Sequence, residues 1–273
     1  MDVAEGWTRI SEERAGGEVV LAVDFPASGR REATFRDLAR LLPEGYDVWH
    51  TAPLPGAERP DTPADAYLTW WTGDLLERRP PVRAVLGYCA GSMFAAALAE
   101  LLDDRLGRRP PLVAFNPGPP TTETLHRDFR AMIEAMTDLE AAERSALHRQ
   151  AADGRAAAGG DFGQLGAAYA RAYAATYAEV FARLGVGASA ADQLTGVFRA
   201  YLAYLGAARG VPDRPRWPAA AAVTSRDQWA SAFCERCDEE YAFDVGREDL
   251  LRSADVAETV SALLRDGTWE AGR

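Results

Sequence analysis

A cysteine between two glycines is the residue of this sequence best placed to do chemistry. Cys89 is the centre of the string G-Y-C-A-G at 87–91, which follows an apolar stretch of strand length and precedes an Ala-rich stretch with helical spacing. A strand, a sharp turn and a helix are the setting of a nucleophile elbow. The glycines suit a close crossing of strand and helix, and the positive end of a helix stabilises a thiolate. We therefore predict that Cys89 is a nucleophile, and not merely a buried cysteine in a tight turn.

Backbone N–H groups near this turn are suited to stabilise an oxyanion. Ala90 stands at the start of the predicted helix. A Pro-small-small-Gly turn at 26–29 follows an earlier apolar strand, and in an α/β-hydrolase the loop at this place supplies the second oxyanion donor. We expect that donor to be the N–H of Ala27 or Ser28. Together the two turns indicate attack on a carbonyl carbon.

A general base has few candidates, because the chain has three histidines and no lysine. His50 falls in a predicted strand, which favours a structural role, and His148 falls in a charged helical segment, which favours contact with solvent. His126 follows the strand after the elbow by a few residues, and it is the histidine that we expect to come nearest to Cys89. Mechanisms that need a lysine, as a Schiff base or as a general base, are excluded.

The elements that must position these residues alternate along the chain, as in a parallel sheet covered by helices on both faces. A short antiparallel edge strand is expected at 7–10. We predict further strands at 18–24, 46–51, 82–88, 112–116, 219–224 and 240–245, and helices at 33–42, 64–78, 92–102 and 255–265.

One long segment contains no predicted strand. From about 122 to 209, apolar and aromatic residues recur at intervals of three and four, which predicts three or four helices interrupted at 154–163 and 185–190. Tyr169, Tyr173 and Tyr177 share one face, where they either pack or line a cavity. An insertion at this place in an α/β sheet lies over the carboxyl ends of the strands, where ligands bind. We therefore divide the chain into a core at 1–120 and 210–273 and a helical lid at 121–209.

This layout resembles the thioesterases of nonribosomal peptide and polyketide assembly lines, including the free-standing type II enzymes. The resemblance rests on the elbow, on the turn at 26–29, on L-P-G at 54–56 and on F-R-A-Y at 198–201, and it extends from about residue 16 to residue 265. It implies an α/β-hydrolase fold, with a mostly parallel central sheet, helices on both faces and a helical lid insertion. It also implies an acyl or aminoacyl thioester substrate, held on the phosphopantetheine arm of an acyl or peptidyl carrier protein.

The sequence departs from the family pattern at all three catalytic positions. The family nucleophile is usually serine, and here it is Cys89. Asn116 occupies the place of a catalytic aspartate after the next strand, while Asp227 occupies the alternative place after the next-to-last strand, and we expect both to position partner groups. The family histidine belongs in the turn V-G-R-E-D at 245–249, where Glu248 stands instead. A carboxylate there is a weak base unless burial makes it more basic.

A nucleophilic cysteine without a histidine after the last strand favours acyl transfer over hydrolysis. A thiol exchanges with thioesters unaided, whereas hydrolysis of an acyl-cysteine needs an activated water. The elbow is also similar to that of cysteine-bearing aminoacyltransferases, which move an aminoacyl group between carrier proteins. We therefore predict an acyl-S-Cys89 intermediate and transfer of its acyl group to an acceptor. Two alternatives remain open: an editing thioesterase that uses His126, and a degenerate hydrolase that only binds a carrier protein or an acyl chain.

The composition limits the classes of molecule that this protein is expected to bind. The 273 residues are 48% apolar, typical of a globular protein, and their net charge of −11 disfavours nucleic acid and anionic membranes. No apolar stretch approaches the ~20 residues that span a bilayer, and the first residues lack the pattern of a signal peptide, so we expect a cytoplasmic protein. An acidic carrier protein needs a local arginine cluster, such as 30–31, 78–79 or 108–109.

The remaining cysteines predict no cofactor. Cys234 and Cys237 form a C-x-x-C in a predicted helix, without the second pair that would complete a zinc site. We expect a structural or surface pair, no bound metal, and no cofactor apart from the phosphopantetheine that carries the substrate.

Overall fold

A mostly parallel sheet forms the centre of the computed structural model, which describes residues 2–12, 17–25, 32–43, 46–185, 187–212, 214, 216–228 and 233–266. Within these residues seven strands lie in the order β1-β3-β2-β4-β5-β6-β7. All neighbouring strands are parallel except β1, which runs antiparallel to β3. The strands are β1 (Trp7–Arg9), β2 (Glu18–Val23), β3 (Tyr46–Thr51), β4 (Val82–Tyr88), β5 (Leu112–Phe115), β6 (Ala220–Ser225) and β7 (Glu239–Phe243).

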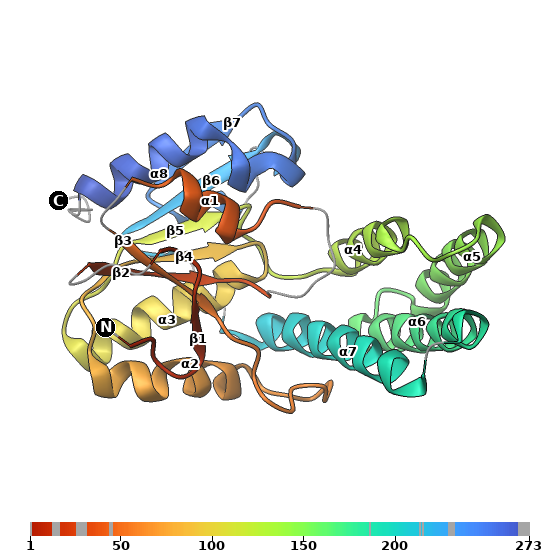
Figure 1. Ribbon diagram of the computed structural model, residues 1–273. Coiled ribbons are helices and arrows are strands. Elements are labelled where there is room, and N and C mark those ends of the chain that lie inside the picture. The colour runs from red at the N-terminus through yellow and green to blue at the C-terminus, as the bar shows by residue number, and fades with distance from the viewer. Residues whose placement is uncertain are drawn as a thin grey trace.

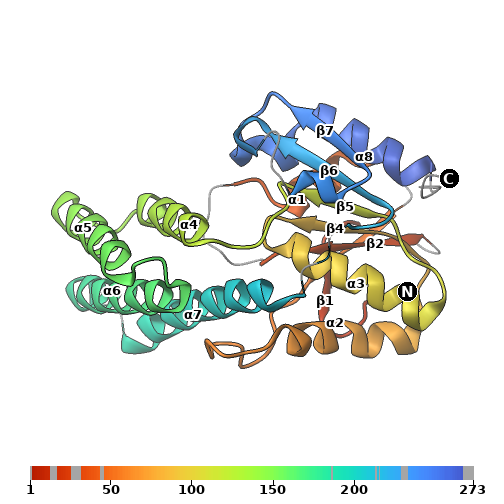
Figure 2. The same ribbon diagram turned by 180° about the vertical axis from the view of Figure 1, so that it is seen from behind.

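Helices cover both faces of this sheet. The helices α2 and α3 lie on one face and α1 and α8 on the other, while α4 to α7 form a group of helices that extends from one end of the sheet (Figures 1 and 2). The α-helices are α1 (Phe35–Leu41), α2 (Ala64–Arg78), α3 (Gly91–Leu106), α4 (Thr122–Ala135), α5 (Ala141–Ala158), α6 (Phe162–Leu184), α7 (Ala188–Gly210) and α8 (Ala254–Asp266). Three short 3₁₀ helices are η1 (Arg226–Gln228), η2 (Cys234–Arg236) and η3 (Arg247–Arg252).

The apolar runs of the sequence correctly predicted a sheet between two layers of helices, because both faces of the sheet are buried. In β2, Val19 and Leu21 join the core beneath α2 and α3, whereas Val20 and Ala22 join the core beneath α1 and α8. A strand with two buried faces needs a continuous apolar run, which is what this stretch provides. The predicted strands agree with the observed ones to within two residues at either end, and the short edge strand β1 is antiparallel as expected.

The insertion consists of α4 to α7, which we call the helical insertion (122–210). Side chains cap α4 and α6: Thr121 accepts a hydrogen bond from the N–H of Thr124 at 3.1 Å, and Asp161 accepts one from the N–H of Gln164 at 2.9 Å. The sequence predicted a break between helices at 154–163. This break begins later than predicted, because α5 continues through Gly154 to Ala158. No helix in the described part of the chain is long and apolar enough to span a membrane.

Close packing explains why Gly154 lies inside a helix. A Cβ atom at this position would stand 3.2 Å from the Cβ of Ala168, on the facing helix α6. The glycine thus lets α5 approach α6, and the chain turns only at Gly159 and Gly160, which have positive φ.

The tyrosines of α6 pack inside the insertion. Tyr169 stacks on Phe129 of α4 with a centroid distance of 4.3 Å, and Tyr173 contacts Phe198 of α7 at 4.5 Å. Tyr169 and Tyr173 are buried. Of the two interpretations, packing is the one that the structure supports.

His50 makes the stability of the core depend on pH. Its ring lies in β3 beside Phe35, and burial, with the charge of Arg36, lowers its pKa to about 4. Between about pH 4 and 6.5 the unfolded chain therefore binds a proton that the folded protein does not, so stability falls as the pH drops through 6.5.

We expect His50→Gln to lose less stability than the wild type when the pH is lowered from 7.5 to 5.5. The difference should be roughly 1 to 2 kcal/mol in the free energy of unfolding, measured by urea unfolding at both pH values. Equal losses in the two proteins would contradict this assignment.

Candidate active site

Cys89 occupies a strained turn between β4 and α3. Its φ of +50° is rare for a residue with a side chain. Hydrogen bonds hold the turn: the N–H of Cys89 donates to the carbonyl of Phe115 at 2.8 Å, and the N–H and hydroxyl of Ser92 donate to the carbonyl of Cys89 at 3.0 and 2.5 Å. Cys89 is 8% exposed. The predicted strand, sharp turn and helix are therefore present, with Cys89 at the turn.

Two glycines allow this turn to form, as the spacing predicted. A Cβ atom at Gly91 would lie 2.2 Å from the carbonyl oxygen of Val23, at the end of β2. A Cβ atom at Gly87 would lie 2.6 Å from the Cβ of Ala95 on α3. Both distances are far below van der Waals contact, so β4, β2 and the start of α3 pack this closely only because these side chains are absent.

Ala90, one of the residues expected to donate to an oxyanion, lies at the start of α3. Ala90 is the N-cap residue of α3, where N–H groups have no partner within the helix. The other expected donors, Ala27 and Ser28, lie outside the described residues.

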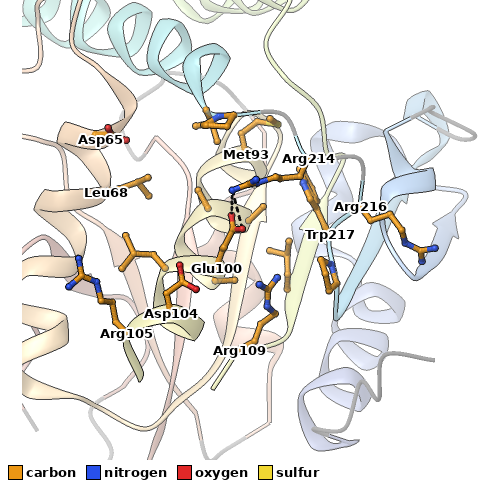
Figure 3. A pocket seen from close by; sticks show the side chains of 18 residues that line it. Asp65, Leu68, Met93, Glu100, Asp104, Arg105, Arg109, Arg214, Arg216 and Trp217 are labelled. Atoms are coloured by element: carbon orange, nitrogen blue, oxygen red, sulfur yellow. Dashed lines mark hydrogen bonds and ion pairs between the residues drawn. The ribbon is translucent and has the colours of Figure 1, made fainter. Parts of the chain in front are cut away.

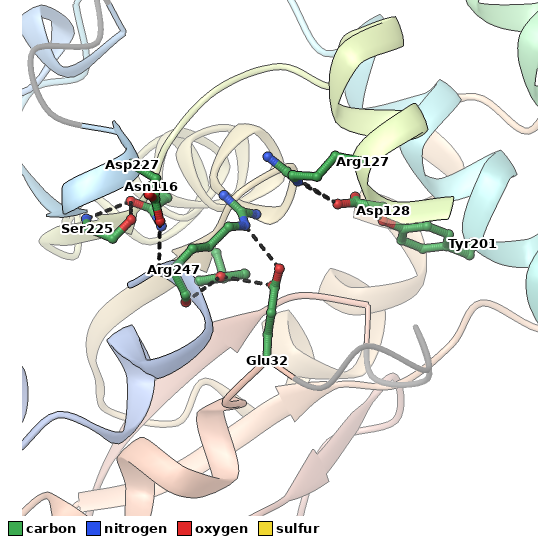
Figure 4. Close-up of polar contacts among 9 residues, drawn as sticks. Glu32, Asn116, Arg127, Asp128, Tyr201, Ser225, Asp227 and Arg247 are labelled. Carbon is green, nitrogen blue, oxygen red and sulfur yellow. Dashed lines mark hydrogen bonds and ion pairs between the residues drawn. The ribbon is translucent and has the colours of Figure 1, made fainter. Parts of the chain in front are cut away.

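Asn116 joins the ends of β5 and β6. It has a φ of +45°, and its Oδ1 accepts hydrogen bonds from the N–H of Ser225 at 2.9 Å and from the Ser225 hydroxyl at 3.2 Å (Figure 4). Its Nδ2 is buried and has no hydrogen-bond partner in the described part of the chain. Asn116 thus stands at the carboxyl end of β5, where the family pattern has an acid, and its oxygen is used within the fold.

Arg247 projects into the site from the turn after the last strand. Its Nε donates to Glu32 at 3.1 Å, the Tyr88 hydroxyl donates to the same carboxylate at 3.0 Å, and its guanidinium lies over the Tyr88 ring at 5.2 Å (Figure 4). The Arg247 side chain is 10% exposed. Burial alone would lower its pKa, but negative groups around it, foremost the Cys89 thiolate, raise that pKa well above the ordinary value. The turn therefore presents a cation that cannot serve as a base.

The two carboxylates predicted near this turn differ in their contacts. Asp227 accepts a hydrogen bond from the backbone N–H of Arg247 at 3.1 Å, so it holds the turn in place. The side chain of Glu248 is exposed, while its carbonyl accepts from the N–H of Ala33 at 2.8 Å. Asp227 is thereby linked to the site, and Glu248 contributes its backbone to the packing of η3.

A second guanidinium reaches the site from the helical insertion. Arg127, on α4, donates through Nε and Nη2 to Asp128 at 3.0 and 2.8 Å, and the Tyr201 hydroxyl of α7 donates to Asp128 at 2.6 Å. Burial and the charge of Arg247 lower the pKa of Arg127, but Asp128 and the Cys89 thiolate leave it raised overall. Figure 4 shows the two guanidinium groups turned toward the same space.

All three histidines lie in the described part of the chain, and each contacts a residue other than Cys89. His126 shares a hydrogen bond of 2.5 Å between its Nδ1 and the Tyr169 hydroxyl, and burial, with the charge of Arg155, lowers its pKa. His148 contacts Glu134 at 2.6 Å, also within the insertion. His50 lies in β3. Each histidine thus has a place in the packing or surface of its own element.

The C-x-x-C forms a 3₁₀ turn and not the predicted helix. Cys234 and Cys237 are both buried, and burial raises the pKa of Cys237 to about 12. A thiol this hard to ionise is a poor nucleophile. Within the described residues no cluster of histidine, cysteine and carboxylate side chains is arranged to hold a metal ion.

A cavity of about 460 Å³ runs along α3. Figure 3 shows that its walls carry charges of both signs, with Arg214 paired to Glu100 at 3.1 Å. Cys89, Arg127 and Arg247 are not among the described residues that line it. This cavity is therefore separate from the candidate active site.

Comparison with solved structures places this site in a known fold. A Vlm2 thioesterase domain, solved with a bound dodecadepsipeptide, is 19% identical over 98% of both chains, with a TM-score of 0.52. The type II thioesterase BorB, from the borrelidin biosynthetic cluster, is 15% identical over 97% of this chain and 98% of its own, also with 0.52. The chain has the α/β-hydrolase fold.

A third similar structure contains this fold as one part of a larger protein. The four-domain nonribosomal peptide synthetase AB3403 is 17% identical over 95% of this chain and 20% of its own length, with a TM-score of 0.56. No family model matches the sequence, and a search of curated proteins finds no match either. At these identities the similarity establishes the fold, and the chemistry must be derived from the residues.

The sequence pattern predicted the elbow but not the two arginines and their carboxylates. Arg247 precedes Glu248 in the turn where the thioesterases that the sequence resembles have histidine. An arginine at this place was the sequence signal that could have indicated its position in the site. Asp128 also gave a signal, since a carboxylate on the buried face of α4 needs a partner. The pairing of Arg247 with Glu32, 215 residues apart, had no signal in local spacing.

Asp128 ties α4 to α7, so its removal should loosen the insertion. We expect Asp128→Asn to lower the free energy of unfolding by about 2 kcal/mol, because charge-assisted bonds to Tyr201 and Arg127 are weakened. Urea unfolding followed by tryptophan fluorescence measures the loss. Glu134→Gln, at an exposed pair with His148, is the control and should leave the midpoint unchanged. Equal midpoints in both variants would show that Asp128 has no such role.

Proposed function

We propose that this protein is a thioester-processing acyltransferase of natural-product assembly lines. Cys89 takes an acyl group from the phosphopantetheine arm of an acyl or peptidyl carrier protein and passes it to an acceptor thiol. The observation that carries the proposal is the position of Cys89, held at φ +50° at the start of α3 between glycines that the packing requires. Solved thioesterases with the same fold support the reaction class.

The reaction exchanges one thioester for another. The Cys89 thiolate attacks the carbonyl carbon of the bound thioester, and the oxyanion lies at the N-terminus of α3, near the N–H of Ala90. As the tetrahedral intermediate collapses, the bond to the pantetheine sulfur breaks, and the released thiolate takes a proton from solvent. The second half runs in reverse: an acceptor thiolate attacks acyl-S-Cys89, and the Cys89 thiolate leaves.

The groups around Cys89 favour transfer over hydrolysis. Hydrolysis requires a base that removes a proton from water, and the histidines have their contacts elsewhere while Arg247 fills the turn after β7. Exchange with a thiol needs no such base, because a few per cent of an ordinary thiol is already ionised at neutral pH. In this proposal Asp227 and Asn116 hold the backbone of the site, and neither contributes a proton.

The carrier protein must dock on a surface that avoids repulsion between acidic chains. Of the three arginine pairs, two are partly engaged: Arg78 contacts Asp74 at 2.5 Å and Arg109 contacts Asp103 at 3.0 Å. Residues 30–31 lie outside the described part. Arg79 and Arg108 are exposed, and we propose that docking through such arginines makes the transfer rate sensitive to salt.

A partition experiment tests the proposal. The enzyme is acylated with an acyl pantetheine thioester, freed of excess reagent, and divided between buffer and buffer with a holo-carrier protein. We expect acyl transfer to the carrier to exceed release of free acid by about 100-fold or more, since only hydrolysis requires activated water. If free acid is the main product in both samples, the protein is an editing thioesterase and not a transferase.

A further inference from the structure

Arg247, whose charge interacts with Cys89, has a donor that no described residue uses. The Nη2 of Arg247 is buried and has no hydrogen-bond partner among the described residues. Arg127 turns its guanidinium toward the same space from α4 (Figure 4). A buried donor without a partner destabilises a protein, and a bound anion at this place would remove that cost.

In the part of the chain that the structure describes, carboxylates hold each guanidinium by one edge. Glu32 accepts from Nε of Arg247, and Asp128 accepts from Nε and Nη2 of Arg127. A guanidinium has five N–H donors in a fixed plane, so further donors of each arginine remain for another anion. The anchoring carboxylates thus orient two cationic groups toward one place next to the nucleophile.

An acyl group on Cys89 brings no negative charge of its own to the sulfur, while both guanidiniums keep their positive charges. Since Arg247 and Arg127 repel each other, the acyl-enzyme is favoured when the acyl group itself brings an anion to this space.

We propose that Arg247 and Arg127 form a carboxylate-binding subsite, and that the acyl group transferred by Cys89 carries a second carboxylate. The substrate class is then a half-thioester of a dicarboxylic acid, an assignment that rests on the proposed function. An aminoacyl group with a free ammonium is disfavoured, because two cations would face it. The phosphate of the pantetheine arm cannot occupy the subsite during transfer, since it is at the far end of the arm from the thioester.

A pair of alkylating reagents tests the subsite without any thioester. Iodoacetate and iodoacetamide both alkylate Cys89 and have nearly the same shape, but only iodoacetate carries a carboxylate. We measure the ratio of their rate constants at Cys89 by peptide mass analysis. This ratio should be roughly tenfold or more higher in the wild type than in Arg247→Gln, because a charge-assisted hydrogen bond is lost.

Further variants separate a local effect from a disturbed fold. Arg127→Gln should also lower the ratio, while Arg247→Lys should keep part of it, since lysine keeps the charge without the planar fork. Arg226→Gln is the matched control, because Arg226 is exposed and pairs with Asp244 at 3.1 Å. Circular dichroism confirms that each variant is folded. An equal ratio in the wild type, in Arg226→Gln and in both Gln variants at Arg127 and Arg247 would overturn the subsite.

A second measurement links the subsite to the substrate. Malonyl, succinyl and glutaryl pantetheine are each compared with the neutral methyl ester of the same acyl group in the rate of acylation of Cys89. We expect at least one acid to react roughly 10- to 150-fold faster than its ester, with the difference lost in Arg247→Gln. Equal rates for acids and esters would overturn the carboxylate assignment and leave the proposed function intact. A third outcome is that no thioester acylates Cys89 while the wild type still reacts faster with iodoacetate than Arg247→Gln does, relative to iodoacetamide. The proposed function and the substrate class would then both be wrong, and the two arginines would be an anion-binding site only.

Discussion

Cys89→Ser should lose at least about four orders of magnitude in the rate of acylation by a pantetheine thioester. A serine hydroxyl needs a base to become a nucleophile, and among the described contacts of Cys89 no histidine is present to supply one. The turn itself should form in the variant, because the hydrogen bonds that hold it are made by backbone atoms and by Ser92. Rapid-quench measurement of acyl-enzyme formation gives the rate.

The size of this loss distinguishes two kinds of site. An enzyme with a general base would tolerate the serine and lose much less. Retention of acylation within about tenfold in Cys89→Ser would therefore show that a base acts on residue 89, and a mechanism without a base would be wrong. A variant at Cys234 serves as the control, because that thiol is buried in another part of the fold.

Gly91→Ala should lower the free energy of unfolding by about 3 to 4 kcal/mol, at the upper end for overpacking. The added Cβ would lie 2.2 Å from the Val23 carbonyl oxygen and 3.1 Å from the Tyr204 hydroxyl. The first atom belongs to the backbone of a central strand, so it cannot move aside as the end of a side chain would. Urea unfolding measures the loss, and the same variant should lose acylation because the elbow is displaced.

Gly73→Ala is the matched control for this prediction. Gly73 lies inside α2 and is exposed, and an added Cβ there would meet open space, with nothing from the rest of the described chain within 4 Å. At this position alanine should stabilise the helix by about 0.5 to 1 kcal/mol, because it has the higher helix propensity. If both alanine variants changed stability in the same direction and by similar amounts, close packing would not explain Gly91.

The fold was predictable because its signals are local and repeated. The run at 18–23 is apolar after its first residue, and a strand buried on both faces requires this. Prediction was poorer at β7, which ends at Phe243 and not at Val245. This edge strand alternates between exposed and partly buried residues, so its apolar pattern is weak.

The candidate site was predictable where neighbours in sequence form it. The elbow is made by consecutive residues, so Gly87, Cys89 and Gly91 indicate it together. The arginines were missed because their positions depend on contacts across the sheet: Glu32 before α1 orients Arg247 after β7, and Tyr201 of α7 fixes the carboxylate that holds Arg127. No spacing rule connects such residues.

The contact that His126 makes was not indicated by its place in the sequence. It follows Asn116 by ten residues, which suggested that it reaches Cys89. Successive residues on a helix point in different directions, and here His126 turns to Tyr169 while its neighbour Arg127 turns toward the site. One position along α4 separates a packing residue from one whose guanidinium turns toward that of Arg247.

The most direct test of the central claim is the intact mass of the protein after exposure to acyl pantetheine thioesters, with the wild type beside Cys89→Ala. We predict a mass gain equal to one acyl group in the wild type, mapped to Cys89, and no gain in the variant. No gain in the wild type with any thioester, or the same gain in both proteins, would contradict an acyl-cysteine intermediate at this turn.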